Sequence, residues 1–440
     1  MEVKPGYKQT EVGVIPTEWE VKPLADLFTF QNGVNADKSA YGKGVAFINV
    51  LEVITHSSLT EAKIPGRVSL SVQARSAFAV QFGDVLFNRT SETQEEVGLA
   101  SVYTGNAEVV FGGFVIRAKP RANSMDPTFT SYVLRSPAVR AQIVARGQGA
   151  IRANIGQRDL SRVLLFLPSI AEQEAIAVAL SDADAFIECL EQLVARKRQL
   201  KRGAMQELLT GKNRLRGFGG SGSKKSEIGE LPNDWCVLKI GKIADVKTGP
   251  FGSSLHERDY VDDGTPIITV EHLGERGITQ TNLPMVSSVD YKRLSSYSLE
   301  EGDIVFSRVG SVDRNARVSS VERGWLFSGR LLRLRVLDGI DTRYLSYHFH
   351  SEPFKRRVRA VAVGQTMASL NTQILKSVLV MVPPLAEQIA IADILSDMDA
   401  EIASLEAKLA KARQIKRGMM RELLTGKIRL EDAAKAAPAL

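Results

Sequence analysis

The sequence predicts an α+β protein with a pseudo-twofold internal repeat, in which two long helices forming an antiparallel coiled coil separate two mixed, mainly β domains. Two observations predict this fold. The 440-residue chain contains a unit of about 215 residues twice, and each unit closes with a heptad-patterned segment. We divide the chain into a domain at 1–165, a helix at 166–211, a flexible linker at 212–226, a domain at 227–380, a helix at 381–430 and a tail at 431–440.

Three segments define the repeat. EVGVIPTEW at 11–19 returns as EIGELPNDW at 227–235, and GDVLFNRT at 83–90 returns as GDIVFSRV at 302–309. The segment 166–215 returns as 381–430 with about 30 of 50 positions identical, far beyond chance for a repeat of this length. Each unit therefore joins a variable front to a nearly identical back, and the two parts have different tasks.

The front of each unit is predicted to be rich in β-strands. Short β-branched and aromatic runs such as Val45–Val53, Val85–Asn88 and Val109–Val115 alternate with Gly, Asn and Asp turns. Trp19 and Trp235 occupy matched places beside an apolar segment, which favours core packing over base stacking.

The back of each unit is predicted to be one long helix. Pro168 and Pro383 precede it, and Gly211 and Gly426 follow it. Apolar residues recur at spacings of three and four. The predicted seam comprises Ile176, Leu180, Ile187, Leu190 and Val194 in the first helix, and Ile391, Leu395, Met398, Ile402, Leu405 and Leu409 in the second. About 39 helical residues make a rod of roughly 58 Å.

Charge along the helices predicts how they pair. Acidic residues dominate the first half of each helix, from Glu172 to Glu191 and from Glu387 to Glu406, and basic residues dominate the second half. Antiparallel packing sets the acidic half of each helix against the basic half of the other. Exposed ion pairs are worth about 0–1 kcal/mol, so charge selects the direction and the seam supplies the stability. Solvated faces with no pairing role are the alternative.

Composition excludes several classes of protein. The 57 Lys and Arg against 50 Asp and Glu leave a net charge of +7, which permits a polyanionic partner without demanding one. Two cysteines are too few for a disulfide framework or a zinc ribbon. No run approaches the about 18 apolar residues of a membrane span, and the first residues lack the apolar core of a signal peptide. We therefore expect a cytoplasmic protein with no membrane partner.

Motifs of the common enzyme classes are missing. No GxxxxGK[ST] loop, GxSxG elbow or HExxH helix occurs. The GxGxxG at 217–222 follows a helix rather than a strand, which excludes a dinucleotide loop. The five histidines show no metal-ligand spacing beyond the pair in YHFH at 347–350, which we expect to be structural and to share one face of a strand. We expect no catalytic residue, no metal and no cofactor, which points to a binding subunit.

The order and duplication of these motifs resemble the specificity subunit of type I restriction-modification systems. Each domain opens with G-x-[IL]-P-x-x-W, and each helix runs from LPSIAEQEAIA or VPPLAEQIAIA to ELLTGK-x-RL. The resemblance covers essentially the whole chain. It implies two target recognition domains, two spacer helices and no catalytic residues. The implied partners are double-stranded DNA, two copies of the methyltransferase (modification) subunit and, through them, the restriction (translocase and nuclease) subunit.

Two unlike domains on a rigid spacer also predict a bipartite, asymmetric DNA target. At about 3.4 Å per base pair, a rod near 58 Å sets the half-site centres roughly 10 to 17 base pairs apart. The alternative from another class is a coiled-coil scaffold whose two β domains bind protein ligands. A fused restriction enzyme is disfavoured because methyltransferase and nuclease motifs are missing.

Three pairs of loops contain the candidate DNA-contacting residues. The loops after the GD strands offer an arginine beside small polar groups, as guanine reading requires: Arg89, Thr90, Ser91 and Glu92, and Arg308, Ser311, Arg314 and Asn315. The loops before the long helices add Gln148, Arg152 and Asn154, and Gln365, Thr366 and Asn371. The loops at Gly33 and Gly249 add Asn32 and Lys38, and Lys247, Ser253, Ser254, His256 and Arg258. Ordinary surface or capped turns are the alternative for each loop.

Two basic segments are expected to hold phosphates rather than bases. They surround Arg140 in the first domain and Lys355, Arg356, Arg357 and Arg359 in the second. Solvated surface is the alternative for both segments.

Overall fold

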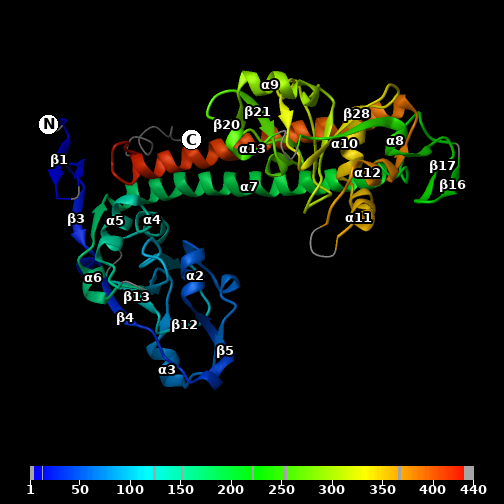
Figure 1. Ribbon diagram of the computed structural model, residues 1–440. Helices are drawn as coiled ribbons and strands as arrows, with labels where there is room; N and C mark the ends of the chain where they lie inside the picture. Colours follow the sequence, from blue (N-terminus) through cyan, green and yellow to red (C-terminus); the bar gives the residue numbers. More distant parts are fainter. Residues whose placement is uncertain are drawn as a thin grey trace, which may run out of the picture. The chain divides into compact units, whose positions relative to one another are not determined.

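The computed structural model describes residues 4–11, 13–121, 125–149, 152–220, 222–250, 255–364 and 368–430. The chain forms two compact units (Figure 1). Unit 1 contains Met1–Leu190 and Lys408–Leu440, and unit 2 contains Glu191–Ala407. Each unit therefore combines one β-rich domain with the start of one long helix and the end of the other.

Unit 1 contains two main β-sheets among its described residues. One has the order β4-β13-β9-β11-β6, from Phe28–Asn32, Val115–Pro120, Val85–Asn88, Ala100–Tyr103 and Ser58–Leu59. The other has the order β7-β5-β12-β8, from Arg67–Val68, Tyr41–Ile48, Val109–Phe111 and Ala79–Val80. Two-stranded pairs join β1 (Tyr7–Thr10) to β2 (Gly13–Pro16), β3 (Glu20–Pro23) to β15 (Leu164–Leu167), and β10 (Thr90–Ser91) to β14 (Ala153–Asn154).

Unit 2 contains a similar set of sheets. One has the order β19-β28-β25-β26, from Ala244–Thr248, Leu331–Val336, Ile304–Ser307 and Asn315–Arg317. The other has the order β20-β24-β21-β27, from Tyr260–Val261, Met285–Val286, Thr265–Ile268 and Leu326–Phe327. Two-stranded pairs join β16 (Ser223–Ser226) to β17 (Gly229–Pro232), β18 (Cys236–Lys239) to β29 (Leu379–Val382), and β22 (Leu273–Gly274) to β23 (Gly277–Ile278).

Short helices flank these sheets. In unit 1 they are α1 (Leu24–Leu27), α2 (Val50–Thr55), α3 (Val72–Ala77), α4 (Pro127–Val133), α5 (Pro137–Arg146) and α6 (Gln157–Ser161), with 3-10 turns η1 (Lys38–Ala40) and η2 (Glu61–Lys63). In unit 2 they are α8 (Ile240–Ile243), α9 (Ser288–Leu294), α10 (Thr342–His350), α11 (Glu352–Val361) and α12 (Thr372–Ser377), with η4 (Glu257–Asp259), η5 (Val270–His272) and η6 (Ser295–Tyr297). The β12–β5, β11–β6 and β21–β27 pairs are parallel and the other strand pairs are antiparallel. Sheets and short helices together form the mixed, mainly β domains that the sequence predicted.

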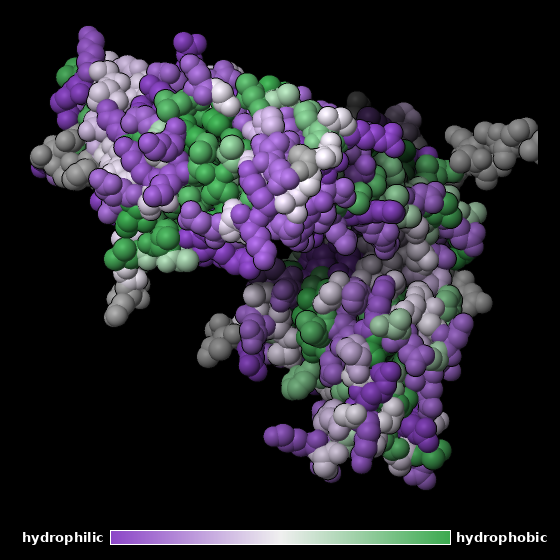
Figure 2. Space-filling view, turned by 90° about the vertical axis from the view of Figure 1, so that its right-hand side faces the viewer, coloured by the Kyte–Doolittle hydropathy of each residue, from purple (hydrophilic) through white to green (hydrophobic). Residues whose placement is uncertain are grey.

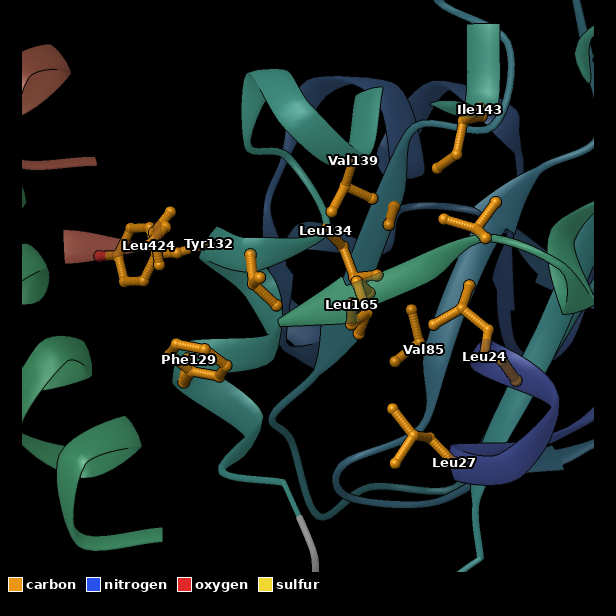
Figure 3. Packing of buried hydrophobic residues seen from close by; sticks show 14 of the residues in the cluster. Leu24, Leu27, Val85, Phe129, Tyr132, Leu134, Val139, Ile143, Leu165 and Leu424 are labelled. Carbon is orange, nitrogen blue, oxygen red and sulfur yellow. The ribbon is translucent and has the colours of Figure 1, made fainter. Parts of the chain in front are cut away.

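The core of unit 1 draws on residues from both ends of the unit's sequence. One buried cluster contains Leu24 and Leu27 of α1, Val85 of β9, Phe129 and Tyr132 of α4, Leu165 of β15 and Leu424 (Figure 3). Leu424 follows α13, so the last part of the chain packs in the same core as the first domain. Trp19 and Trp235 are 1% and 0% exposed, which confirms core packing for both indoles.

The long helices are α7 (Ile170–Leu208) and α13 (Leu385–Leu423), and they pack antiparallel as predicted. In unit 1 Lys416 forms an ion pair with Asp184. In unit 2 Lys201 lies 2.6 Å from Asp399, and Lys197 lies 2.6 Å from Glu401. Of the predicted seam residues, seven are buried and four are partly buried. The buried ones are Ile176, Leu180, Leu190, Val194, Ile391, Leu395 and Ile402, and the partly buried ones are Ile187, Met398, Leu405 and Leu409.

The structure differs from the sequence prediction in four places. Phe166–Leu167 and Met381–Val382 end strands β15 and β29, so α7 and α13 start only after the prolines. The segment expected as a flexible linker contains β16, which pairs with β17. The YHFH segment lies in α10 rather than in a strand, because the capping residue Asp341 begins a helix there. Val50–Val53 belongs to α2 and not to a strand.

Candidate nucleic-acid interface

The AEQ segment that opens α7 anchors the β-rich domain of unit 1. The Glu172 side chain is only 1% exposed, and its Oε2 accepts a hydrogen bond of 2.9 Å from Trp19 Nε1. Arg429, which follows α13, donates to the same carboxylate from Nε at 2.7 Å and from Nη2 at 3.0 Å. The closing motif of the second repeat therefore completes the domain of the first.

Unit 2 has the same arrangement with the roles of the two repeats exchanged. Glu387 Oε2 accepts a hydrogen bond of 2.9 Å from Trp235 Nε1. Arg214 donates to Glu387 at 2.8 and 2.6 Å and to Asp234 at 2.9 and 2.8 Å. Hydrogen bonds from the two carboxylates, with that of Glu387 the stronger cause, raise the pKa of Arg214. Because Arg214 belongs to the segment expected as a linker, this contact holds that segment in place.

The glutamine of each AEQ segment holds the short helix that packs beside it. Gln173 Oε1 accepts a hydrogen bond of 2.9 Å from the backbone N–H of Asp126. Gln388 Oε1 does the same for Asp341, also at 2.9 Å. These two aspartates cap α4 and α10. The duplicated Glu and Gln therefore connect each domain to its long helix.

A tyrosine on the same short helix reaches further along the coiled coil. Tyr347 OH donates to Asp399 Oδ2 at 2.9 Å, and Lys201 lies over the Tyr347 ring at 5.1 Å. Burial, as the main cause, raises the pKa of Tyr347 to about 12. Unit 1 repeats this group with Tyr132, Asp184 and Lys416. Each domain is thus fixed to the helix pair at two levels, which gives the loops at its surface a rigid support.

The GD segment forms a tight turn before a buried strand. Gly83 and Gly302 have φ values of +86° and +91°, which favour glycine. Asp84 Oδ2 accepts from the backbone N–H of Gln81 at 2.9 Å, and burial raises the pKa of the Asp84 carboxyl. Strands β9 and β25 follow these turns, and the candidate arginines Arg89 and Arg308 come directly after the strands.

The structure brings two of the predicted loops of unit 1 together. Strand β10 pairs with β14, and Thr90 Oγ1 donates to Asn154 Oδ1 at 2.8 Å. Gln148 and Asn154 exchange backbone hydrogen bonds of 2.8 and 2.7 Å. Arg152 lies 3.9 Å from Glu92. Arg89, Glu92, Gln148, Arg152 and Asn154 are all exposed, so the two segments present one continuous polar surface.

Unit 2 has the same pairing of loops. Gly310 N donates to Ala368 O at 2.8 Å, and Leu370 N donates to Arg308 O at 2.8 Å. Ser311 is exposed and Arg308 is partly buried. Asn371 caps α12, because its Oδ1 accepts from Ile374 N at 2.8 Å. Gln365 and Thr366 lie outside the described residues.

The third pair of loops is less uniform. Asn32 Oδ1 accepts a hydrogen bond of 2.9 Å from Gln157 Nε2, and Lys38 is exposed in η1. Lys247 Nζ donates to Ser296 O at 2.6 Å, and burial lowers the Lys247 pKa. His256 and Arg258 are exposed, whereas Ser253 and Ser254 lie outside the described residues. Lys247 is therefore tied to its own domain.

Three candidates of the GD loops are held by their own domain. Ser91 is 5% exposed and donates to Glu96 Oε2 at 3.1 Å. Asn315 is 1% exposed and lies in β26. Arg314 is exposed, but its Nη2 donates to the carbonyl oxygens of Leu273 and of Glu271, the latter at 3.3 Å. Burial leaves Ser91 and Asn315 little surface to offer a ligand, while Arg314 is held in place at the surface.

The two basic segments are the helices α5 and α11, and most of their charges already have partners. Arg140 Nη2 donates to the carbonyl oxygens of Glu95 and Val97 at 2.7 and 2.8 Å, and burial lowers its pKa. Arg359 and Lys355 pair with acidic side chains, Arg357 is partly buried, and Arg356 is exposed. Arg140 is thus a structural residue. Hydrophilic side chains cover most of the face in Figure 2, with smaller hydrophobic areas between them.

Sequence reasoning missed a cavity in unit 2. It has a volume of about 980 Å³ and is bordered by Thr269, Glu271, Asn282, Arg314 and Arg330, among others. Arg314 was predicted from its place after a GD strand, but the other residues come from segments that carry no recognisable motif in the sequence. Only the fold brings them together.

The described residues show neither a metal-binding cluster nor a membrane-spanning helix. Histidine, cysteine, aspartate and glutamate side chains do not gather there in groups that could hold a metal ion. Within the same residues, no helix combines the length and the apolar composition needed to cross a membrane.

Comparison with known sequences identifies relatives over nearly the full length. A family described as the type I restriction modification DNA specificity domain matches residues 16–197 and 232–414. A Methanocaldococcus jannaschii protein named as the MjaX specificity subunit of a type I restriction enzyme is 27% identical over 97% of both chains. The EcoKI specificity subunit of Escherichia coli is 20% identical, covering 91% of this chain and 86% of its own.

Solved structures share the fold. The type I restriction-modification S subunit from M. genitalium has a TM-score of 0.55 at 16% identity, covering 96% of this chain and 98% of its own. The HsdS subunit from Thermoanaerobacter tengcongensis has a TM-score of 0.50 at 14% identity, covering 94% and 98%.

Proposed function

Because this chain belongs to the type I restriction-modification DNA specificity family, and is a non-catalytic DNA target-recognition subunit, we propose that it reads a bipartite, asymmetric target. In this proposal each unit reads one half-site. The main support for this proposal is that the two units share one scaffold but differ in the side chains of their paired loops. Unit 1 presents Arg89, Thr90 and Asn154, whereas unit 2 presents Arg308 and Ser311 at the corresponding edge. Unlike side chains on a common scaffold favour unlike half-sites.

Sequencing of methylated DNA from a host that expresses this chain with its modification subunit tests the proposal. Two short, different sequences separated by a constant unread gap are expected. A palindromic or single continuous target would contradict it. Substitution of residues 89–92 should change the base sequence of one half-site only. Substitution of residues 308–311 should change the base sequence of the other half-site only.

We further propose that two modification subunits bind, one to each unit, and that the restriction subunit joins through them. The support is the duplicated frame of tryptophan, glutamate and arginine, which gives both units equivalent surroundings at the helix ends. Mass measurement of the assembled complex under a saturating excess of modification subunit should give two copies per chain. A single copy under these conditions would contradict the proposal. A subunit that recognises chromosomal DNA acts in the compartment that contains this DNA. We therefore propose that the protein is located in the cytoplasm.

The gap between half-sites offers a separate test of the helices as spacers. Each long helix contains 39 residues, and deletion of one heptad shortens a helix by about 10 Å. Removing one heptad from each helix should therefore change the number of unread base pairs. A recognition sequence with an unchanged gap would reject the spacer role and leave the half-site proposal intact.

A further inference from the structure

The turns that join β12 to β13 and β27 to β28 are closed by equivalent backbone hydrogen bonds. Val115 N donates to Gly112 O at 2.8 Å, and Leu331 N donates to Ser328 O at 3.0 Å. These bonds close four-residue turns whose central residues are 113–114 and 329–330. Phe114 in unit 1 and Arg330 in unit 2 therefore hold the same position.

Both turns are tied to the candidate DNA-contacting loops. Arg89 N donates to Phe114 O at 2.8 Å, and Arg308 N donates to Arg330 O at 2.8 Å. The glycines singled out in the third pair of loops also lie against these turns. A Cβ on Gly33 would collide with the backbone of Gly112, and a Cβ on Gly249 would collide with the backbone of Ser328. Three loops thus meet at this turn in each unit, and the backbone of the turn is held rigidly.

The two side chains at this position differ in chemistry. Phe114 is 65% exposed, although both strands beside it are buried. Its backbone carbonyl accepts from the exposed Arg89, and the next residue, Thr90, donates to Asn154. An apolar ring in polar surroundings can make one kind of specific contact with a base edge in the major groove, which is contact with the C5-methyl group of thymine.

Arg330 is exposed and borders the cavity of about 980 Å³ in unit 2. Ser328, in the same turn, also borders this cavity and is 8% exposed. Its Oγ is buried and has no hydrogen-bond partner among the described residues. Arg314, held by the two backbone carbonyls, forms another part of the wall. Arg314 and Arg330 therefore bring positive charge to a wall that also contains Asp262 and Glu271. The exposed guanidinium of Arg330 suits an acceptor-rich base edge such as guanine O6 and N7.

We propose that Phe114 and Arg330 are specificity-determining residues: Phe114 contacts the methyl group of a thymine in one half-site, and Arg330 donates a bidentate pair of hydrogen bonds to a guanine in the other. This inference rests on the proposed function and deepens it by giving the base chemistry of one position in each half-site. The scaffold places position 114 and position 330 alike, so the side chain alone sets which base is favoured.

Base analogues test each contact in the complete complex with its modification subunits. Replacing thymine by uracil removes only the methyl group, and 7-deazaguanine removes only the N7 acceptor. With the wild-type chain, uracil at one position should weaken binding about fourfold, the effect of one buried methyl group. At one guanine of the other half-site, 7-deazaguanine should weaken binding about tenfold, within the range of a base-specific contact.

Variants assign these effects to the two residues. In Phe114→Ala the uracil effect should disappear while the 7-deazaguanine effect stays, and Arg330→Ala should show the reverse. Leu51→Ala is the control for Phe114, because Leu51 is 70% exposed on α2 of the same unit. Arg323→Ala, at an exposed arginine of unit 2, is the control for Arg330. Both controls should keep both effects.

The results test the thymine contact and the guanine contact separately. If the uracil effect persists in Phe114→Ala, or occurs at no position, the thymine contact is wrong. If Arg330→Lys keeps the full preference for guanine, the bidentate contact is wrong, because lysine lacks the planar fork. If Arg330→Ala weakens binding equally at every sequence, Arg330 binds a phosphate instead. These results would leave the bipartite target standing, whereas a wild-type complex without any preferred half-site would overturn the proposed function itself.

Discussion

Arg429 Nε donates a hydrogen bond of 2.7 Å to Glu172 Oε1, although 257 positions separate the two residues in the chain. The corresponding bond in unit 2 joins Arg214 to Glu387. Each repeat therefore ends inside the domain of the other repeat. Tyr7 OH adds a hydrogen bond of 3.0 Å to Gly426 O, so both terminal segments are bound into unit 1.

Replacing Glu172 by alanine should destabilise unit 1 strongly. The variant leaves Trp19 Nε1 without its acceptor and removes the buried carboxylate partner of Arg429, which keeps its contact of 2.9 Å with the more exposed Glu18. Removing one partner of a buried ion pair typically costs about 3–5 kcal/mol, and some exposure of Arg429 places the expected loss near 3 kcal/mol. Urea denaturation would measure it. The neighbouring Glu174 is exposed, so Glu174→Ala should change the free energy of unfolding by less than about 0.5 kcal/mol. Equal losses in the two variants would contradict the buried frame.

Two glycines of the repeat should respond to alanine in opposite directions. Gly211 has φ +69°, and a Cβ there would lie 2.6 Å from Pro232 Cδ, so Gly211→Ala should destabilise unit 2 by more than about 1 kcal/mol. Gly203 lies inside α7, and a Cβ there would meet no atom within 4 Å apart from its chain neighbours and the surrounding helix backbone. Gly203→Ala should therefore stabilise the chain by about 0.5–1 kcal/mol. Thermal unfolding of both variants would show the difference in sign. A loss of stability in Gly203→Ala would indicate a contact at that face.

Unit 2 should lose stability as the pH falls below 6.5. Burial, aided by the charge of Arg357, lowers the pKa of His348 to about 3. The unfolded chain takes up a proton near pH 6.5 while the folded chain does not, so stability is lost between pH 6.5 and about 3. Urea midpoints measured from pH 7 to pH 4 should fall less steeply in His348→Phe. His56→Phe, in unit 1, serves as the control and should leave the slope of unit 2 unchanged.

Exchange of charges should reveal coupling across the helix pair. Lys201 and Asp399 have side chains 16% and 24% exposed, and they lie 2.6 Å apart. Lys201→Glu should destabilise unit 2, and adding Asp399→Lys should restore part of the loss, with a coupling energy of about 1 kcal/mol. The more exposed pair of Lys197 and Glu401 provides a weaker matched cycle. No coupling in either cycle would mean that charge does not select the antiparallel direction.

Two arginines of the basic helices should behave differently towards DNA. Arg140 donates to two backbone carbonyls, so Arg140→Ala should lower the free energy of unfolding by about 1–3 kcal/mol and leave the salt dependence of DNA binding unchanged. Arg356 is exposed, and Arg356→Ala should reduce the slope of log K against log salt by about 0.9 if it neutralises one phosphate. Titrations at several salt concentrations measure both slopes. A flatter slope in Arg140→Ala would contradict its structural assignment.

Much of the fold could be predicted from the sequence because its signals are local. The heptad spacing from Ile176 to Val194 predicted a buried seam, and the order of charges predicted antiparallel packing. The YHFH segment was predicted wrongly, since alternation over four residues does not distinguish a strand from the helix that Asp341 caps. Short segments carry too little periodicity to overrule their context.

The candidate site could be predicted only in part. The sequence indicated Arg89 and Asn154 separately. The two residues lie on one surface only because β10 pairs with β14. Asn315 was a candidate from its neighbours in the chain, yet the strand places it in the interior. Phe114 and Arg330 had no motif, because their positions become equivalent only through backbone hydrogen bonds.

The sequence by itself determined the duplication, the two long helices, their direction and the absence of familiar catalytic motifs, since periodicity, charge order and motif spacing are properties of the linear chain. Only the tertiary structure decided that the arginine of each closing motif binds the same glutamate as the tryptophan of the other repeat. Hydrogen bonds such as that of Arg429 with Glu172 join residues far apart in the chain, and in a repeat both copies offer the same partners. Only the antiparallel packing of α7 and α13 selects between them.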